Sequence, residues 1–330
     1  MTLDQQSATV PAVGGAPAGA VGGQVVVIAV TWNSAAVLPG FLAALPEGMG
    51  GVDDWRLVVA DNASADDTVA VLRELAPDAQ VVQTGRNAGY AAGINAALAA
   101  CDPATTRAVL ISNPDVRMRA GCARTLVDAL DTPQPDGSRT GIAVPVLHEE
   151  DDAIFPSLRR EPSVARAFGE AVLGNRRAGR FGRWGEMITD PAVYTRPTRA
   201  DWAGGAIMVL SRNCLDACGP WDESFFLYSE ETEYCLRARD LGYATCLAPE
   251  ASAVHLGGDS RVSPRLWTLQ TLNRVRLYRL RHGAAATAAF HAAVLLREAS
   301  RAALGRSRGP NRAAAAALLN PSRLAEKPGP

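Results

Sequence analysis

The chain has 330 residues, a length that fits one large or two small domains. Hydrophobic residues make up 48% of it and charged residues 20%, which excludes a globally disordered protein. The formal net charge of −1 gives no indication of nucleic-acid binding, and the best candidate for a membrane span, residues 284–296, is too short and contains His291.

Charge is distributed unevenly along the chain. Residues 261–330 contain 13 basic and two acidic residues, whereas residues 1–260 contain 20 basic and 32 acidic residues. A basic C-terminal region favours a peripheral contact with an anionic partner such as a membrane surface, although the two parts also neutralise each other. The six cysteines lack metal-binding spacing, so we expect reduced thiols and a cytoplasmic protein, at most at the inner face of the cell membrane.

The first half of the chain alternates between apolar strands and helices. Residues 1–23 predict a flexible leader, because they lack the basic segment of a signal peptide. The predicted elements are strands at 24–31, 56–60, 80–84 and 107–112 and helices at 35–45, 64–76, 88–101 and 119–130. The start at Ser64 is predicted from a capping box that includes Asp67. This alternation predicts an α/β fold with a mostly parallel sheet and helices on both faces.

The second half is less regular. Residues 148–200 are rich in Arg and Pro and predict an excursion over the sheet. An apolar run follows at 203–210, then a helix at 229–241 that ends at Gly242, two short strands at 243–247 and 252–256, and helices from residue 265. After Gly305 the low complexity of the sequence predicts a mobile tail.

Polar residues follow several of the predicted strands. Right-handed crossovers would bring Thr31, Asp61 and Asp115 to one edge of the sheet, where open α/β folds bind ligands. Asp61 can accept hydrogen bonds from a nucleobase or a ribose, although it also belongs to a helix start. Asp115 is suited to hold Mg²⁺ or Mn²⁺ against a diphosphate, and Asn113-Pro114-Asp115 is also typical of a turn. His255 could add an imidazole ligand, but a lone strand-end His is more often structural.

Two further segments combine structural and chemical signals. Residues 85–95 form a glycine-spaced loop whose amides and Arg86 could face phosphate, while Gly89 and Gly93 favour close helix packing. Residues 229–233 place three carboxylates in the first turn of a helix, where they offset the helix dipole. One of them could also act as a general base, and we expect only one of Glu230 and Glu231 to face a cleft.

Six motifs, in this order, resemble the family 2 glycosyltransferases of the GT-A fold. They are Val30-Thr31-Trp32-Asn33, the Asp61-Asn62-x-Ser64-x-Asp66 run, Asn87-x-Gly89, Asn113-Pro114-Asp115, Trp202-Ala203-Gly204-Gly205-Ala206 and Phe225-Phe226-Leu227-Tyr228-Ser229-Glu230-Glu231. The resemblance implies a GT-A domain at 24–260, followed by a basic helical extension at 261–305 and a low-complexity tail at 306–330. Asn-Pro-Asp with Trp-x-x-Gly-Ala is most similar to the bacterial rhamnosyltransferases.

The resemblance also implies an activity. It is inverting transfer of a sugar, L-rhamnose from dTDP-L-rhamnose, onto a glycan or lipid-linked acceptor in cell-wall or surface polysaccharide synthesis. The alternatives are another nucleotide-sugar donor, such as a hexose or galactofuranose nucleotide, or a non-catalytic nucleotide-sugar-binding protein. No nucleic-acid partner is expected.

The same resemblance implies roles for individual residues. Asp115 would bind the divalent metal, with His255 as a second ligand, and Glu231 would be the catalytic base. Asn113 replaces the first acid of the family's Asp-x-Asp, which should weaken metal affinity. The expected contacts with substrate are Thr31, Asn33, Asp61, Asn87, Asn113, Trp202, Gly205 and Glu230.

Overall fold

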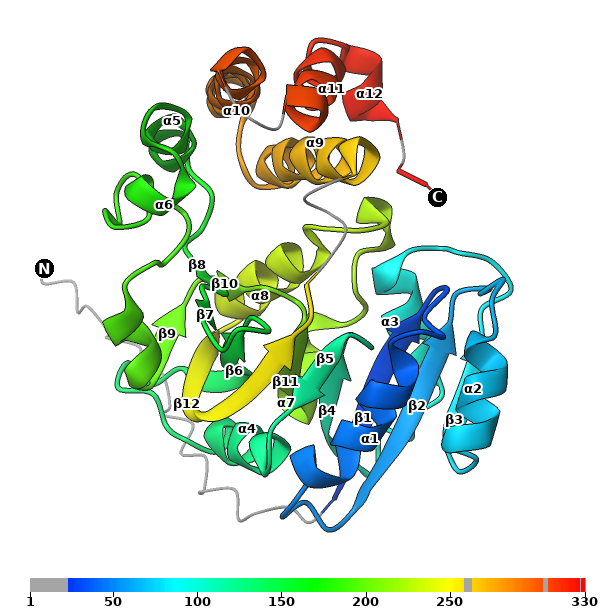
Figure 1. The fold of residues 1–330 in the computed structure, drawn as a ribbon. Helices are drawn as coiled ribbons and strands as arrows, with labels where there is room; N and C mark the ends of the chain where they lie inside the picture. Colours follow the sequence, from blue (N-terminus) through cyan, green and yellow to red (C-terminus); the bar gives the residue numbers. More distant parts are fainter. Residues whose placement is uncertain (1–22, 258–262, 305–307, 327, 330) are drawn as a thin grey trace, which may run out of the picture.

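The computed structural model describes residues 23–257, 263–304, 308–326 and 328–329. Residues 1–22 of the predicted leader lie outside this range. A large sheet occupies the centre of the molecule, helices cover both of its faces, and a layer of C-terminal helices lies across one end (Figure 1). No described helix is long and apolar enough to span a bilayer.

The central sheet has the strand order β3-β2-β1-β4-β11-β6-β12-β5, and β7 and β9 pair with β6 and β12. Its strands are β1 (Gln24–Thr31), β2 (Trp55–Asp61), β3 (Gln80–Gln83), β4 (Thr106–Ser112), β5 (Val116–Met118), β6 (Arg139–His148), β7 (Ile154–Phe155), β9 (Thr198–Ala200), β11 (Ile207–Ser211) and β12 (Tyr243–His255). Two further strands, β8 (Leu158–Arg159) and β10 (Trp202–Ala203), form a separate ribbon.

The first four strands in the chain pair in parallel, as predicted from the alternation of strands and helices. The rest of the sheet is mixed, because β11 runs antiparallel to both of its neighbours, β4 and β6. The chain reaches β11 through the excursion at 148–200, not through a crossover helix. Beyond β11 the strands β6 and β12 again pair in parallel, so the parallel pairing that we expected is interrupted by β11 and by the short strands β5, β7 and β9.

Burial explains why this sequence forms a sheet with two covered faces. Val26, Ile28 and Val30 lie in one apolar core, while the intervening Val25 and Val27 lie in the other. Successive side chains of a strand point to opposite faces, so a continuous apolar run requires helices on both sides. The helices on the first face are α3 (Tyr90–Ala99), α7 (Arg212–Cys218) and α8 (Glu230–Asp240), and those on the second are α1 (Leu38–Gly48), α2 (Thr68–Leu75) and α4 (Cys122–Leu130).

Two local predictions differ from the structure. Helix α2 begins at Thr68, not at Ser64, because the Ser64 hydroxyl donates to Asp61 (2.6 Å) and accepts from the amide of Asn33 (2.9 Å). The two strands predicted at 243–247 and 252–256 are one strand, β12, whose register with β6 shifts between Ala248 and Ser252.

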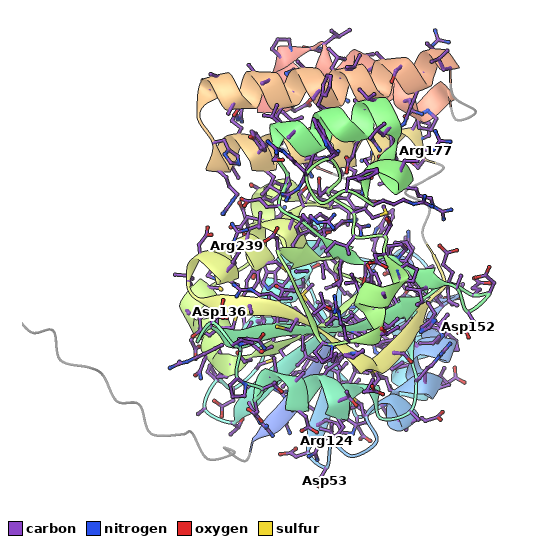
Figure 2. The ribbon with its side chains drawn as sticks, turned by 90° about the vertical axis from the view of Figure 1, so that its left-hand side faces the viewer. Asp53, Arg124, Asp136, Asp152, Arg177 and Arg239 are labelled. Carbon is purple, nitrogen blue, oxygen red and sulfur yellow. The ribbon has the colours of Figure 1, made fainter. Side chains whose placement is uncertain are left out.

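The excursion at 148–200 contains two α-helices, α5 (Val164–Leu173) and α6 (Asn175–Ala178), and a 3-10 turn at Pro191–Thr195. Helix α5 packs on the C-terminal layer, which consists of α9 (Pro264–Arg281), α10 (Ala284–Leu304), α11 (Arg308–Leu318) and α12 (Pro321–Ala325) (Figures 1 and 2). The tail after Gly305 was expected to be mobile, but Ala314 and Leu318 of α11 are buried. The alanines of this low-complexity segment form a helix that packs on α9 and α10.

Candidate active site

The ends of β1 and β2 meet at one sheet edge, as predicted. Thr31 pairs with Asp61 in the parallel register, and its hydroxyl donates to the Asp61 carboxylate (3.0 Å). Asp61 also accepts from the Ser64 amide (3.0 Å) and hydroxyl, and it is 2% exposed. The Asn33 side chain accepts from the Ala65 amide (2.8 Å). These bonds fix the loop that follows β2, so Asp61 and Asn33 shape this edge of the site from within the protein.

Asp115 and His255 come together beyond the ends of β4 and β12. The Nε2 atom of His255 lies 3.3 Å from Oδ2 of Asp115. The other carboxylate oxygen of Asp115, Oδ1, is buried and has no hydrogen-bond partner among the described residues. A buried acceptor without a partner costs free energy unless a ligand satisfies it. The pair therefore has the ligand types and the unused capacity that a divalent cation requires.

Glu230 and Glu231 begin helix α8, and the structure separates their roles. Glu230 is 2% exposed, and its Oε2 atom has no hydrogen-bond partner among the described residues. Burial and the neighbouring Glu231 raise the pKa of Glu230 well above its usual range. Glu231 is half-buried, its side chain lies against Gly205, and burial raises its pKa as well. Of these two acids, only Glu231 is partly exposed, and its raised pKa makes its carboxylate a stronger base than that of an ordinary glutamate.

Tyr90 at the start of α3 is a further residue of the site, and no pattern in the sequence indicated it. Its phenol approaches the carbonyl of Gly205 (3.4 Å). Its pKa is raised by burial and by the negative charges of Glu230, Glu231 and Asp115. The phenol thus contacts the same residue, Gly205, against which Glu231 lies. Tyr90 belongs to a helix whose small residues had indicated only packing.

Arg159 is a second residue that the sequence did not indicate. It ends β8, its guanidinium lies over the ring of Trp202 (5.8 Å to the centroid), and its positive charge lowers the pKa of Glu231. The indole of Trp202 donates to the carbonyl of Arg160 (3.1 Å) and thereby holds the ribbon of β8 and β10 beside the site. Contacts of this kind depend on tertiary structure, so no spacing in the sequence reveals them.

The remaining candidates lie around this centre. Asn87 accepts from the amide of Gly89 (3.1 Å), and the half-buried side chain of Asn113 follows β4. Gly89 has a φ of +98°, and a Cβ atom there would lie 2.2 Å from the carbonyl oxygen of Phe226. A glycine is thus required at position 89 for close packing, which is the interpretation that the sequence favoured. Arg86, the other candidate in this loop, is exposed.

The loop that precedes α8 has an unusual backbone. Phe226, Tyr228 and Ser229 all have positive φ angles, between 65° and 79°. Such conformations cost of order 1–3 kcal/mol each for residues other than glycine and persist only where the surroundings enforce them. Asn273 of α9 supplies the enforcement: it is fully buried, and its side-chain amide donates to the carbonyls of Phe225, Leu227 and Tyr228 (2.8, 2.9 and 3.1 Å).

Two adjacent acids at the start of α8, a carboxylate–imidazole pair and a loop at the ends of β1 and β2, all on an α/β sheet, are the features expected of a glycosyltransferase of the GT-A class. Comparisons with known proteins support this class of enzyme. Residues 26–159 match the model of the family described as glycosyl transferase family 2. The protein is a glycosyltransferase, and residues 26–159 carry its similarity to family 2.

Curated relatives share moderate identity with the chain. An N-acetylglucosaminyl-diphospho-decaprenol L-rhamnosyltransferase of Mycobacterium tuberculosis is 27% identical over 237 residues, which is 69% of this chain and 75% of that protein. The low-salt glycan biosynthesis hexosyltransferase Agl10 of Haloferax volcanii is 27% identical over 187 residues, which is 56% of this chain and 53% of that protein.

Solved structures support the fold. The mannosyltransferase PcManGT from Pyrobaculum calidifontis, in complex with GDP-Man and Mn²⁺, has a TM-score of 0.54 at 18% identity and covers 93% of this chain and 84% of its own. GalNAc-T7 with UDP, GalNAc and Mn²⁺ has a TM-score of 0.52 at 12% identity, with 77% and 47% covered. Both are glycosyltransferases, and the predicted GT-A fold is confirmed.

Proposed function

We propose that the protein is an inverting glycosyltransferase that moves L-rhamnose from dTDP-L-rhamnose to a hydroxyl of a lipid-linked acceptor. The observation that carries the proposal is the geometry around Gly205. The side chain of Glu231 lies against this glycine, and the phenol of Tyr90 donates to its carbonyl (3.4 Å). The amide of Asn113, two residues before Asp115, donates to the carbonyl of the next residue, Ala206 (2.8 Å). One acid for the leaving diphosphate and another for the attacking hydroxyl would thus be available within one site. The name of the mycobacterial relative, with its diphospho-decaprenol acceptor, supports the choice of donor sugar and acceptor.

Asp115 and His255 would hold Mg²⁺ or Mn²⁺ in this mechanism. A bound divalent cation neutralises the charge that develops on a departing nucleoside diphosphate. Among the described residues, no cluster of three or more acidic, histidine or cysteine side chains is arranged to hold a metal. The diphosphate and water would therefore complete the coordination, and Asn113, close to Asp115 in the chain, offers a neutral amide oxygen at the position of the first acid in the Asp-x-Asp pattern that this segment resembles.

Glu231 would accept the proton of the attacking hydroxyl. A general base works best when its pKa lies near the working pH, and the raised pKa of Glu231 brings it closer to that value. The positive charge of Arg159 opposes part of this shift and keeps a fraction of Glu231 ionised. Glu230, buried behind it, would stay protonated and hold the start of α8 in place.

The nucleotide would bind along the ends of β1 and β2. The Asp61 carboxylate already accepts hydrogen bonds from Thr31 and Ser64. We therefore expect it to act mainly by holding the loop that carries Asn33, which is exposed and available to a base or ribose. Trp202, Gly205 and Asn87 would border the sugar and acceptor side. An acceptor on a lipid also implies work at the inner face of the cell membrane.

The test is transfer from dTDP-L-rhamnose, measured as dTDP release in the presence of Mn²⁺ and an acceptor. Glu231→Gln should lower kcat by about 10²- to 10⁴-fold, the usual contribution of a general base, while donor affinity is retained. Glu233→Gln is the matched control, because Glu233 lies in the same helical turn but pairs with Arg237. Asp115→Asn should instead weaken Mn²⁺-dependent donor binding. Full activity of Glu231→Gln would refute the assignment of the base.

The donor needs a separate test. A panel of nucleotide sugars read by thermal shift should give the largest stabilisation with dTDP-L-rhamnose. A larger shift with a GDP- or UDP-hexose would favour the alternative that the hexosyltransferase relative suggests, with the same base and metal site.

A further inference from the structure

Residues 164–184 form an exposed surface away from the active site, which we call the 164–184 surface. Five of its large apolar side chains are exposed to solvent: Phe168 (48%), Val172 (62%), Leu173 (42%), Phe181 (55%) and Trp184 (42%). Four of its basic side chains are exposed and have no hydrogen-bond or ion-pair partner among the described residues: Arg176, Arg177, Arg180 and Arg183. Clustered exposed aromatic residues are uncommon on a protein surface that contacts only water.

These side chains belong to one continuous surface. Phe168 and Val172 are four residues apart in α5 and therefore share one helix face. Trp184 lies against the same helix, since a Cβ atom on Gly169 would be 2.8 Å from the Cβ atom of Trp184. Arg166 of α5 donates to the carbonyl of Gly182 (3.1 Å) and holds the following loop beside the helix. Figure 2 shows Arg177 close to the C-terminal layer, at the opposite end of the molecule from Asp53 and Arg124.

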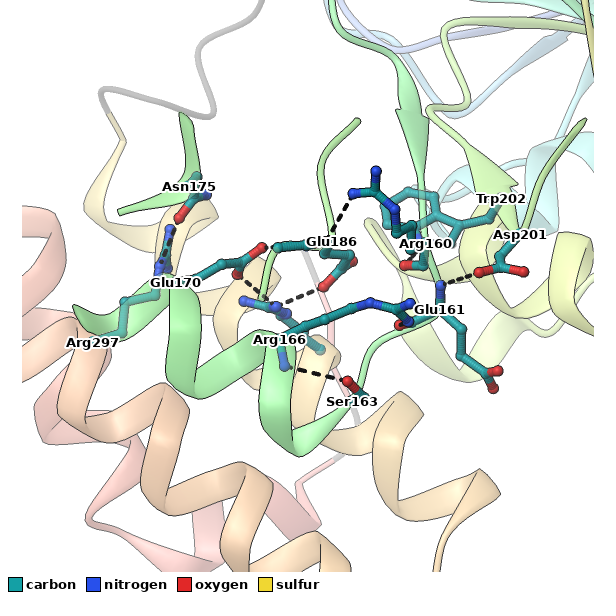
Figure 3. A network of polar contacts seen from close by, with 12 residues as sticks. Arg160, Glu161, Ser163, Arg166, Glu170, Asn175, Glu186, Asp201, Trp202 and Arg297 are labelled. Atoms are coloured by element: carbon teal, nitrogen blue, oxygen red, sulfur yellow. Dashed lines mark hydrogen bonds and ion pairs between the residues drawn. The ribbon is translucent and has the colours of Figure 1, made fainter. Parts of the chain in front are cut away.

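The surface carries only positive charge. Glu170 is the one acidic residue between 164 and 184, and it is buried in an ion pair with Arg274 of α9 (2.8 Å). Glu186, just beyond the segment, pairs with the same guanidinium (2.6 Å). Figure 3 shows Glu170 and Glu186 close together in the network of polar contacts beside α5. An outer face with arginine and aromatic side chains and no acid is complementary to anionic phospholipid headgroups above an apolar layer.

The surface is also connected to the active site. Arg159 and Arg160 are consecutive residues whose guanidinium groups have different surroundings. The guanidinium of Arg159 lies over the ring of Trp202 (5.8 Å to the centroid) and its charge lowers the pKa of Glu231, whereas Arg160 donates to the carbonyls of Gly185 (3.0 Å) and Met187 (3.2 Å). The backbone that directly follows the 164–184 surface is thus fixed to Arg160. The preceding residue, Arg159, is the one whose charge acts on Glu231.

The basic C-terminal region is less suited to this role than its composition suggested. Many of its guanidinium groups are occupied by contacts inside the protein: Arg274 and Arg281 with acids, Arg276 with backbone carbonyls and Asn273, Arg297 with Glu298, and Arg301 with the Glu170 carbonyl. Arg279 and Arg312 are exposed.

We propose that the 164–184 surface docks the protein on membranes that contain anionic phospholipid. The aromatic and aliphatic side chains enter the headgroup boundary, and the four arginines bind lipid phosphates. If the proposed function holds, this contact brings the lipid-linked acceptor to the side of the site that carries Arg159 and Glu231.

The test is co-sedimentation with vesicles of phosphatidylcholine alone or with added phosphatidylglycerol, at low and at high salt. The wild type should bind the anionic vesicles, and salt should weaken the binding. The variant R176E/R177E/R180E/R183E should lose about 100-fold or more in partitioning, and F168S/F181S/W184S should lose binding at every salt concentration. The matched control R279E/R312E alters exposed arginines of the C-terminal region and should bind like the wild type.

Two further measurements separate the possible failures. Rhamnosyl transfer to a water-soluble acceptor should be unchanged in both surface variants, which shows that they are folded. E231Q should bind vesicles normally, so membrane docking can be judged even if the proposed reaction is wrong. Wild-type binding that is equal for neutral and anionic vesicles, or a loss confined to R279E/R312E, would overturn the proposal, as would surface variants that bind like the wild type.

Discussion

The ionisation of Glu231 depends on burial, on backbone amides and on a neighbouring charge. Burial raises its pKa, while hydrogen bonds from backbone amides at the start of α8 and the positive charge of Arg159 lower it. Glu230 behind it has a pKa raised further, so the two consecutive acids differ in their tendency to lose a proton. A pair of carboxyl groups in unlike environments is how one site can hold both a neutral acid and a charged base.

This balance predicts a pH effect. A base is active only when deprotonated, so the acidic limb of kcat/KM should lie above the usual Glu pKa of about 4.3. Removing the positive charge in Arg159→Met should raise the pKa of Glu231 and move that limb to still higher pH. The measurement is the pH profile of kcat/KM for both proteins, with Arg279→Met as a control. An acidic limb that stays in place would show that Arg159 does not act on the base.

At the scale of elements, the loop before α8 depends on a helix that lies outside the sheet. Asn273 of α9 satisfies three carbonyls of that loop, and Arg276 in turn donates to the Asn273 side-chain oxygen (2.6 Å). Three positive φ angles among the four residues 226–229 are therefore stabilised by a separate element. The position of Glu231 is set by α9 as much as by its own helix.

Asn273→Ala should accordingly lower both stability and turnover. Leaving buried carbonyls without a donor costs roughly 1–3 kcal/mol of unfolding free energy. We also expect kcat to fall more than donor affinity, because Asn273 acts through the loop that positions Glu231. Urea unfolding and steady-state kinetics measure the two effects. Thr268→Ala on the same helix is the control, since its hydroxyl bonds only within α9 (2.7 Å to the Pro264 carbonyl). Unchanged kcat in Asn273→Ala would leave the residue a purely structural role.

The sequence predicted those elements whose signal is local. The β-branched run at 25–30 identified β1, and Gly242 marked the end of α8 with a φ of +86°. Ser64 misled us because a capping serine and a serine that bonds a strand-end carboxylate look the same in a sequence. The residues from 148 to 200 could not be assigned, because α5 is fixed by a distant partner, Arg274. Tyr90 and Arg159 were missed for the same reason.

For the molecule as a whole, the C-terminal helices and the 148–200 excursion form one buried polar interface. Arg274 of α9 reaches across it to Glu170 and Glu186, both buried. Beside it, Arg297 pairs with Glu298, whose carboxylate also accepts from the indole of Trp267 (2.9 Å). A buried pair contributes little net stability, but the loss of one partner is costly.

Arg274→Met should therefore destabilise the protein by about 3–5 kcal/mol near neutral pH, because two buried carboxylates lose their counter-charge. Without the cation, the pKa values of Glu170 and Glu186 rise, so the variant should be closer to wild type at acid pH and should lose stability as the pH increases. Denaturant unfolding at several pH values measures this. The triple variant E170Q/E186Q/R274M should recover much of the loss. An equal penalty at all pH values would contradict the electrostatic explanation.

The three hydrogen bonds from Asn273 to the loop before α8 also have a consequence for the synthesis of the protein. A nascent chain that has emerged only as far as His255 already contains Asp115, Tyr90, Arg159 and both glutamates of α8. It still lacks Asn273 and therefore the three hydrogen bonds that α9 makes to the loop, although the amide of Tyr90 can already donate to the carbonyl of Phe226 (2.8 Å). We therefore expect the loop to reach its final shape only after α9 has been synthesised and has docked.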